Sequence, residues 1–539
     1  MTPVREHAAP PCVVHEDDDL LVVNKPPGWN THAPAPHAGE GIYDWLKHRE
    51  GRWSRLAIVH RLDRDTSGLI VFGKTPEANR SLTAQFTERR VYKQYTLVTD
   101  RPVPRETFTV LSAIVRAGDH YLARPLPAEG EPAETRFRVA HREAGRTWID
   151  AEPVTGRTHQ IRVHAAAEGL PILGDLLYGG SAASRLHLHA TVLEFQHPRF
   201  AEPLRLTAPP DFVTPVFRQL RAATIERPCT DTFREIHGAA DGKPGRYQER
   251  LGAWLLLLGG EAPSASEASE LLGSATGPPR VRGVYFKRLL RQVPNASAGE
   301  AAPQLVAGEP APGRFPVREH GVNYELSVTE GYSVGLFLDQ RDNRRRLLHG
   351  HVASDFPLYA AESDAAPEVL NCFAYTCAFS VCAALGGARV TSLDLSRKYL
   401  NWGRRNFALN GLDPAAHEFI YGDVFDWLKR LAKKSRSFAV ILLDPPTFSR
   451  SRGHGDFRCD TDYGRLVSLA LPLLRSGGVL LASTNMARLG PEPFIAQLHA
   501  AIHGAGRDII REHYVSQPPD FPVTRDEPAH LKTLWLKIS

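Results

Sequence analysis

The sequence predicts a multidomain protein whose C-terminal part is an α/β domain with a doubly wound, open sheet. A chain of 539 residues is too long for a single hydrophobic core. From residue 369 onward, short apolar strands alternate with amphipathic helical patterns, which is typical of βαβ units. Before residue 220, short β-like runs dominate and the helical segments are brief. We therefore expect domains at 1–220 and 311–539, joined by a small accessory domain at 221–310.

Composition and charge narrow the class of protein. The chain is 42% apolar and its net charge is only +5, so any nucleic-acid surface is local. Basic clusters occur at 88–93, 287–291 and 341–346, and each alone is most simply a solvated helix face. The six cysteines show no metal-ligand spacing, so we expect no metal site and a reducing, cytoplasmic compartment. No apolar run is long enough for a signal peptide or a membrane span.

The segment around Asp63 is the strongest local signal in the N-terminal part. It reads IVHRLDRDTSGLIVFGK over residues 58–74, with apolar runs on both sides and charge only in the turn. Burying a carboxylate there is costly unless it is paired or hydrogen-bonded. From spacing alone, the loop is either a surface turn with a local ion pair or a rigid mount for one carboxylate.

The neighbouring segments follow in order. A Pro-Pro-Gly turn comes after Lys25, helical spacing covers 75–90, and alternation predicts a strand over 91–99. The middle part is β-rich, with a hairpin expected over 136–154. The segment TGRTHQIRVHAAAEG at 155–169 has helical spacing and carries several basic side chains.

Four motifs in this part resemble one known family. HRLDRDTSG, NKPPG, the K-x-Y of the strand at 91–99 and GRTHQIRVH, in that order, closely resemble the RluA-type pseudouridine synthases. The resemblance covers nearly all of 13–215. It implies an α+β mixed-sheet fold that isomerises uridine in RNA without a cofactor or a metal.

The resemblance also implies roles for single residues. Asp63 is the expected catalytic carboxylate, and Arg162 is expected to pair with it and keep it ionised. Tyr95 is the expected active-site tyrosine, which helps to remove the proton from C5 of the base. A stacked uridine must be extruded, and Arg61 is expected to fill the gap that it leaves.

In the C-terminal part, acidic residues end three successive apolar strands. The run 369–396 predicts strand, turn, helix and strand, and its second strand ends in Asp394. Asp423 follows a further apolar strand, and FAVILLDPP places Asp444 at the end of another. An acid at the end of the second strand is the usual partner of ribose hydroxyls in doubly wound nucleotide sites. The pattern predicts an adenosine ligand at this edge of the sheet.

This part resembles the RlmK/RlmI type of 23S rRNA methyltransferases. The resemblance rests on HGAADGKPG at 237–245, on NCFAYTCAFSVCAALGGA after the first strand, and on DPPTFSRS. It implies binding of S-adenosylmethionine by Asn371, Phe373, Tyr375, Asp394, Asp423, Asp444 and Pro445. Cys377 stands where those enzymes have glycine, which raises the alternative of an inactive RNA-binding platform.

Two further expectations concern the substrate. Cytosine-C5 methylation needs a cysteine nucleophile, whereas Thr447 and Asn485 occupy the two usual places and Cys459 is expected in a loop. The resemblance to the RlmK type implies methylation of guanine N7 instead. We therefore expect a bifunctional enzyme that acts on 23S rRNA, with a tRNA target for the synthase or a cytosine-C5 methyltransferase as alternatives. The sequence predicts no oligomeric state.

Overall fold

The computed structural model describes residues 9–200, 202–274, 279–289, 302–330, 333–359, 365–451 and 455–539. The chain forms two compact units, which meet in the sequence between Glu226 and Arg227. Two short segments, 35–39 and 48–54, are grouped with the second unit. The boundary expected at 220 falls inside helix α4 (Val216–Thr224). A separate domain at 221–310 remains a prediction. Within the described ranges, no helix has both the length and the apolarity needed to cross a bilayer.

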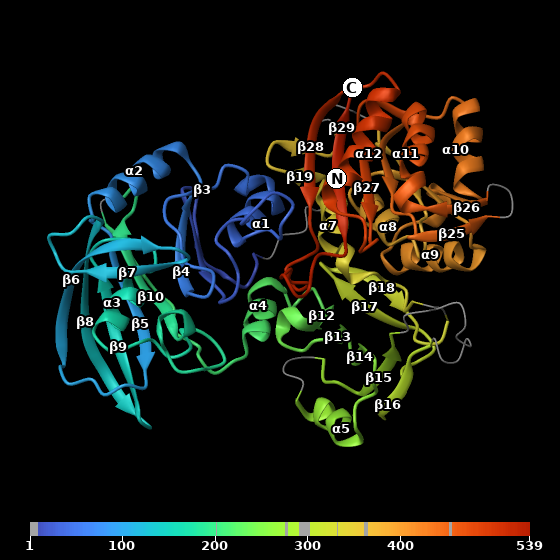
Figure 1. Ribbon diagram of the computed structural model, residues 1–539. Helices are drawn as coiled ribbons and strands as arrows, with labels where there is room; N and C mark the ends of the chain where they lie inside the picture. The colour runs from blue at the N-terminus through green and yellow to red at the C-terminus, as the bar shows by residue number, and fades with distance from the viewer. Residues whose placement is uncertain are drawn as a thin grey trace. The chain divides into compact units, whose positions relative to one another are not determined.

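The first unit is built on one 11-stranded mixed sheet (Figure 1). The strand order is β1-β2-β4-β10-β5-β9-β8-β6-β7, with β3 beside β4 and β11 beside β10. Only β4 and β10 pair in parallel among these strands. The strands are β1 (Val13–Glu16), β2 (Leu20–Lys25), β3 (Ala57–Ile58), β4 (Ser67–Gly73), β5 (Tyr92–Thr99), β6 (Thr107–Ala117), β7 (His120–Arg124), β8 (Glu131–Glu143), β9 (Arg146–Pro153), β10 (Leu188–Gln196) and β11 (Pro203–Thr207). This confirms the expected α+β mixed-sheet fold.

Short helices accompany this sheet: α1 (Ile42–Arg49), α2 (Pro76–Thr87), α3 (Gln160–Ala167) and α4. Helix α3 begins later than the spacing of 155–169 predicted. His159 has left-handed backbone, with φ of 56°, and the Gln160 side chain accepts from the Arg157 amide at 3.0 Å. Residues 155–159 therefore form a loop held by the first side chain of the helix.

The second unit contains a seven-stranded sheet in the order β23-β22-β21-β24-β27-β29-β28. The first five strands pair in parallel, and β29 pairs antiparallel with both β27 and β28. The strands are β21 (Glu368–Cys372), β22 (Arg389–Asp394), β23 (Glu418–Tyr421), β24 (Phe438–Leu443), β27 (Leu474–Thr484), β28 (Ile509–Val515) and β29 (Lys532–Ile538). The doubly wound fold is confirmed.

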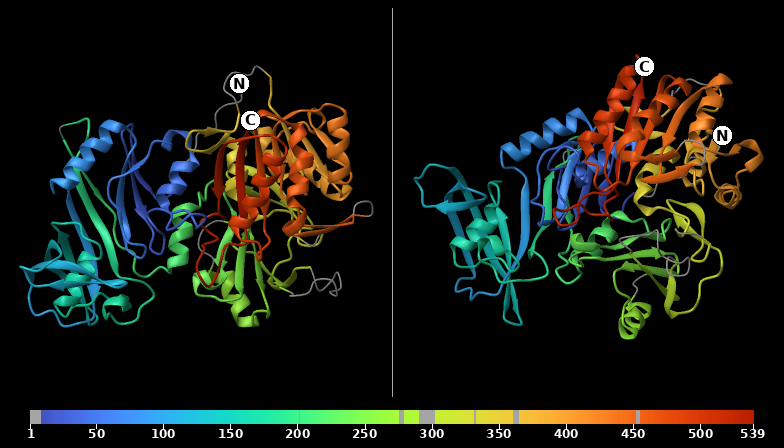
Figure 2. Two further views of the ribbon diagram at one scale, coloured as in Figure 1. Left: turned by 45° about the horizontal axis from the view of Figure 1, so that its top comes forward. Right: turned by 45° about the vertical axis from the view of Figure 1, so that its right-hand side comes forward.

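Both faces of this sheet are buried, because alternate residues of each strand enter different cores. Along β24, Val440 belongs to one apolar cluster and Ile441 to the other. Helices α7 (Arg341–His349), α8 (Ala378–Leu385) and α9 (Arg397–Leu409) contribute to the first cluster. Helices α10 (Val424–Lys433), α11 (Cys459–Ala470) and α12 (Pro491–Gly504) contribute to the second. Figure 2 shows this domain from two further directions, in yellow to red.

One segment of this domain differs from its predicted structure. The pattern of LPLLRSGGVLLAST at 471–484 predicts a helix, a Gly-Gly turn and a strand. The structure instead has a 3-10 turn at Leu471–Leu473 followed by a continuous β27. The Gly-Gly pair lies inside the strand because the pairing of β24 with β27 shifts in register there.

A smaller five-stranded sheet precedes the parallel one in the sequence, in the order β12-β13-β14-β15-β16. Its strands are β12 (Thr232–His237), β13 (Arg246–Leu251), β14 (Trp254–Gly259), β15 (Gly283–Arg288) and β16 (Gln304–Gly308). The Ala/Gly/Pro/Ser-rich composition of 259–279 and 294–313 predicts flexible insertions or linkers. The first stretch instead contains helix α5 (Ala265–Ser274), which packs on β15 and β16. Residues 275–278 and 294–301 of the two stretches lie outside the described residues.

Three two-stranded sheets complete the second unit: β17 (Phe315–Glu319) with β18 (Val322–Leu326), β19 (His351–Ala353) with β20 (Phe356–Pro357), and β25 (Phe448–Ser451) with β26 (Gly455–Arg458). The arginine-rich helix α7 is not a solvated face. Arg341 makes a bidentate ion pair with Asp520, and Arg344 makes one with Glu319. Both guanidinium groups are almost fully buried. The basic cluster at 341–346 is therefore part of the core.

Two candidate active sites

The first candidate site lies in the loop between β3 and β4. The Asp63 carboxylate is 30% exposed, and its Oδ2 lies 3.6 Å from Nη1 of Arg162 and 3.8 Å from Nε2 of His159. The next strand, β4, is fixed at Gly68, where a Cβ atom would lie 2.4 Å from the backbone of Ala190. The loop therefore holds one accessible carboxylate next to a cationic group.

Arg162 has a closer partner than the one that the sequence predicted. Its Nε and Nη2 donate to the two carboxylate oxygens of Asp175 at 2.7 and 2.8 Å. Its guanidinium carbon also lies 5.0 Å from the centre of the Tyr178 ring. Asp175 is 2% exposed, so the bidentate pair is internal. Arg162 is thus fixed by Asp175 and directs its remaining nitrogen, Nη1, toward Asp63.

The other two expected residues differ in their surroundings. Tyr95 lies on β5, and burial together with the charge of Asp63 raises the pKa of its phenol. At neutral pH it is therefore a neutral hydroxyl. Arg61 is exposed and has no side-chain partner among the described residues. Its guanidinium is available to a ligand.

Lys25 is a buried cation beneath this loop. Its Nζ donates to the carbonyl oxygens of Pro26, Trp29 and Arg64 at 3.1, 2.7 and 3.0 Å, and the residue has 0% exposure. Three acceptors match the three N–H donors of an ammonium group. Burial lowers the pKa of Lys25 to about 7, although the charges of Asp65 and Asp63 oppose the shift. Lys25 therefore ties the turn after β2 to the Asp63 loop.

We expect Lys25→Met to lower the free energy of unfolding of the first unit by about 3 kcal/mol or more, because three carbonyls lose their shared donor. The corresponding decrease in melting temperature is about 6–12 °C. Calorimetry of the full chain measures it. Lys47→Met is the control, since the Lys47 ammonium donates to the hydroxyl of Tyr43 at 3.2 Å from a half-buried position. Equal shifts in the two variants would contradict the bridging role of Lys25.

Several residues of this site were not assigned a role from the sequence. Asp175 orients Arg162, and the Tyr178 hydroxyl lies 2.8 Å from Nδ1 of His159. A weak signal existed for Asp175, because it is the one acid in the otherwise apolar run LPILGDLLYGG. Its partner nevertheless depends on the packing of α3.

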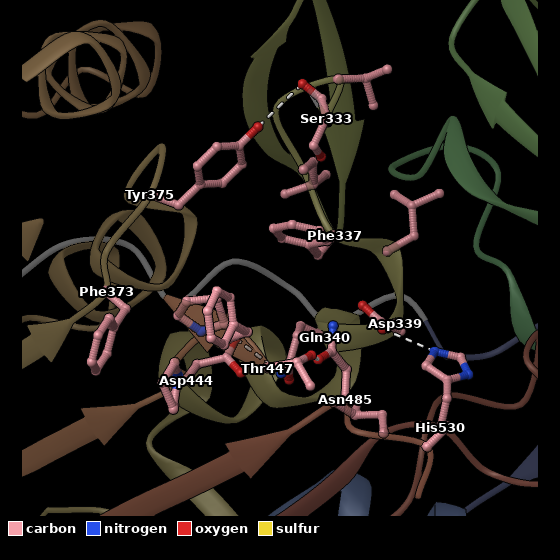
Figure 3. A pocket seen from close by; sticks show the side chains of 18 of the residues that line it. Ser333, Phe337, Asp339, Gln340, Phe373, Tyr375, Asp444, Thr447, Asn485 and His530 are labelled. Carbon is pink, nitrogen blue, oxygen red and sulfur yellow. Dashed lines mark hydrogen bonds and ion pairs between the residues drawn. The ribbon is translucent and has the colours of Figure 1, made fainter. Parts of the chain in front are cut away.

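The second candidate site is a cavity of about 1280 Å³ in the second unit, at the C-terminal ends of the parallel strands. Six of the seven predicted cofactor residues line it, namely Phe373, Tyr375, Asp394, Asp423, Asp444 and Pro445. Figure 3 labels Phe373, Tyr375 and Asp444 among them. Asn371 does not line it. Asn371 lies within β21 and its amide donates to Ser380 Oγ of α8 at 2.8 Å, so it is buried beneath that helix.

The loop after β21 has an unusual backbone. Phe373, Tyr375 and Cys377 have φ values of 58°, 49° and 62° without being glycine. Asp394 fixes this loop, since its carboxylate accepts from the amides of Tyr375 and Ser396, each at 2.8 Å. Burial raises the pKa of Asp394.

Cys377 faces away from the cavity. It is not among the lining residues, and a Cβ atom on Gly403 of α9 would lie only 2.3 Å from its sulfur. The side chain therefore occupies the space that a glycine in α9 leaves open. The methionine part of a cofactor would not meet it.

Asp444 contributes a carboxylate to the wall of the cavity. Gln340 Nε2 donates to its Oδ2 at 3.2 Å, and Asp339 lies nearby on the same 3-10 turn as Gln340. Burial, reinforced by the charge of Asp339, raises the pKa of Asp444 to about 7. Its charge therefore changes near neutral pH.

The cavity fits S-adenosylmethionine by the chemistry of its walls. Asp394 offers a carboxylate for ribose hydroxyls, and the Phe373 and Tyr375 rings offer apolar surface. The volume exceeds that of most small-ligand pockets, which leaves room for a second ligand beside the cofactor.

Comparisons with known proteins cover both parts of the chain. Residues 19–167 match the family model of RNA pseudouridylate synthases, and residues 288–537 match that of S-adenosylmethionine-dependent methyltransferases. The Ribosomal RNA large subunit methyltransferase I of Klebsiella pneumoniae is 32% identical over 58% of this chain and 74% of its own. The Ribosomal large subunit pseudouridine synthase C of Yersinia pestis is 38% identical over 37% of this chain and 66% of its own. A crystal structure of a putative methyltransferase complexed with SAH aligns at 28% identity, with a TM-score of 0.48, over 57% of this chain and 76% of that chain.

Proposed function

We propose that this chain modifies large-subunit ribosomal RNA at two nucleotides. Its C-terminal part belongs to the S-adenosylmethionine-dependent methyltransferases, and its N-terminal part belongs to the RNA pseudouridylate synthases. The observation that carries the proposal is the presence of two separate sites, the Asp63 loop and the Asp444 cavity, in one chain. The names of the two curated proteins described above refer to the large subunit of the ribosome, and one of them to its RNA, so we propose 23S rRNA as the shared substrate. Because the proposed substrate is ribosomal RNA, we also propose that the protein acts in the cytoplasm.

In the first site, we assign the isomerisation of uridine to Asp63. Its carboxylate assists cleavage of the glycosidic bond, and the guanidinium of Arg162, 3.6 Å away, lies beside its negative charge. After the C1′–N1 bond breaks and a C1′–C5 bond forms, the C5 proton passes to the Asp63 carboxylate, with the neutral Tyr95 hydroxyl as a relay, and N1 takes up a proton from water. Exposed Arg61 enters the base stack in place of the extruded uridine. The fixed position of Arg162 supports these roles, because Asp175 prevents its guanidinium from moving away.

In the second site, we assign methylation of guanine N7, for which S-adenosylmethionine supplies the methyl group. N7 carries a lone pair and needs no activation by a nucleophile, so positioning is sufficient. The methylated base is a cation, which the carboxylates of Asp444 and Asp339 stabilise. The inactive-platform alternative is disfavoured by the position of Cys377 against α9.

The cysteines argue against cytosine-C5 methylation. No cysteine of the described residues lines the cavity. Cys459, expected in a loop, begins helix α11 with 0% exposure, and its Sγ donates to the Pro446 carbonyl at 3.4 Å. Burial raises the pKa of Cys459 to about 11, so the thiolate needed as nucleophile is scarce.

The charge of Asp444 predicts a pH dependence of methyl transfer. A carboxyl with a pKa of about 7 is mostly neutral at pH 6 and mostly ionised at pH 8. Only the ionised form stabilises the cationic base, so we expect kcat/KM to rise about tenfold between these values and then to level off. Asp444→Asn should be slower at pH 8 by about 10²-fold and independent of pH. Initial rates with tritiated cofactor measure both profiles, and a flat wild-type profile would refute this role.

The whole proposal is tested by mapping pseudouridine and 7-methylguanosine in 23S rRNA and tRNA from cells that lack the protein. Rescue with Asp63→Ala should restore only the methyl mark, and rescue with Asp444→Ala only the pseudouridine, both on 23S rRNA. Loss of a tRNA mark instead would assign the synthase to tRNA. Full restoration by Asp444→Ala would leave the second unit as a binding platform.

A further inference from the structure

Asp339 presents an unused carboxylate oxygen to the second cavity. Its Oδ2 is 3.1 Å from Nε2 of His530, whereas Oδ1 makes no hydrogen bond with any described residue. The side chain is 15% exposed and lines the cavity. The side chain is largely buried, and a carboxylate oxygen that lines a cavity without a protein partner can accept a hydrogen bond from a ligand.

The position of Asp339 separates it from the cofactor end of the cavity. In Figure 3, Phe373 and Tyr375 lie on one side, Asp339 and His530 lie on the other, and Asp444 and Thr447 lie between them. If the adenosine lies by Asp394 and methyl transfer occurs near Asp444, the substrate base must lie on the Asp339 side. This side is walled by the small sheet, through Arg234, Tyr247 and Glu249.

The walls on this side suit a planar base. The Arg234 guanidinium carbon lies 4.5 Å from the ring centre of Phe521 and 5.3 Å from that of Tyr247, and all three residues line the cavity. Arg234 is itself held by Glu249 at 2.8 Å. Aromatic rings and a guanidinium plane are the surfaces on which extruded bases stack.

The Watson–Crick edge of guanine matches an ionised carboxylate better than the Watson–Crick edges of adenine, cytosine and uracil do. Guanine presents two adjacent donors, N1–H and N2–H. Adenine and cytosine place an acceptor next to their amino group, and uracil places its single N–H between two acceptors. Burial alone would raise the pKa of Asp339, but the hydrogen bond from His530 lowers it, so the carboxylate accepts and does not donate.

We propose that Asp339 is the specificity-determining residue of the methyltransferase site, and that its carboxylate accepts hydrogen bonds from N1–H and N2–H of the target guanine. His530 is then a positioning residue, since it fixes the carboxylate. The proposal rests on guanine as the substrate of the proposed function.

The test uses the full chain and two short RNAs that differ at one atom group. One carries the mapped target guanosine, and the other carries inosine there, which lacks the N2 amino group. We expect wild-type kcat/KM to be at least tenfold lower on the inosine RNA. Asp339→Asn should lower the rate on the guanosine RNA by about 10²-fold and should discriminate less than threefold between the two RNAs.

Two controls keep the outcomes separate. Asp508→Asn makes the same change of charge at an exposed position of the second unit and should behave as wild type. The dissociation constant of S-adenosylmethionine, measured by calorimetry, should be unchanged in Asp339→Asn. A tenfold weaker cofactor constant would overturn the proposal, because Asp339 would then bind the cofactor's ammonium group.

Discrimination that persists in Asp339→Asn would also overturn the proposal. If Asp339→Asn does not fold, the rates of the wild-type enzyme on the two RNAs test the proposal. Equal rates would show that no protein group contacts N2–H of the target guanine, and the proposal would then be wrong. A wild-type enzyme that methylates cytosine instead refutes the proposed function itself, which the mapping experiment detects separately.

Discussion

Asp63→Asn should form pseudouridine at least about 10³-fold more slowly than the wild-type chain, while its methyl transfer is unchanged. The substitution keeps the size of the side chain and removes only the ionised oxygen on which the proposed chemistry depends. The fold should persist, because Arg162 keeps its bidentate partner Asp175 when Asp63 is neutral. Release of tritium from 5-tritiated uridine in 23S rRNA measures the synthase rate.

The control for this variant lies two residues along the same loop. Asp65→Asn makes the same chemical change at an exposed carboxylate and should keep nearly full activity. Methylation of the same RNA by each preparation reports that the chain is folded and binds RNA. An Asp63→Asn protein that retains a tenth of the wild-type rate would show that another group performs the chemistry.

The sequence was most informative where the signal is local. The apolar run that follows the Asp63 turn forms strand β4, and the run 369–396 forms β21, α8 and β22 as its pattern predicted, because both depend on the periodicity of neighbouring residues. The Asp394 carboxylate could be placed at the cavity because a residue that ends a parallel strand lies at the ligand edge of the sheet.

Asn371 shows the limit of the same argument. It was predicted at the ligand edge, one residue before the end of β21, but adjacent residues of a strand point to opposite faces. Its side chain therefore lies beneath α8, where it donates to Ser380. A difference of one residue decides between a ligand contact and a buried structural amide.

Other features could not be predicted because their partners are distant in the sequence. The arginines of α7 form a basic run that looks solvated, yet their carboxylates come from Glu319 and Asp520. The wall of the second cavity likewise combines Arg234 of the small sheet with Phe521 near the C-terminus. Only the tertiary fold brings such residues together.

Two variants separate the structural role of Arg162 from its proposed catalytic role. Arg162→Met leaves Asp175, which is 2% exposed, as an unpaired buried charge. We expect the free energy of unfolding of the first unit to fall by about 3–5 kcal/mol. Arg162→Met combined with Asp175→Leu removes both charges and should recover most of that loss, because an internal ion pair can be replaced by apolar groups of similar volume. Thermal unfolding of both variants measures the difference.

Pseudouridine formation should not recover in the double variant. Asp63 would still lack the cation that lies 3.6 Å from its carboxylate, and we expect a rate at least about 10²-fold below wild type. If stability and activity both return, Arg162 serves only the fold, and His159, whose Nε2 is 3.8 Å from Asp63, is the remaining side-chain partner of that carboxylate. If stability returns without activity, the two contacts of Arg162 explain why an arginine is needed at this position. The buried carboxylate of Asp175 holds the guanidinium in place, and its remaining nitrogen, Nη1, faces the catalytic carboxylate of Asp63.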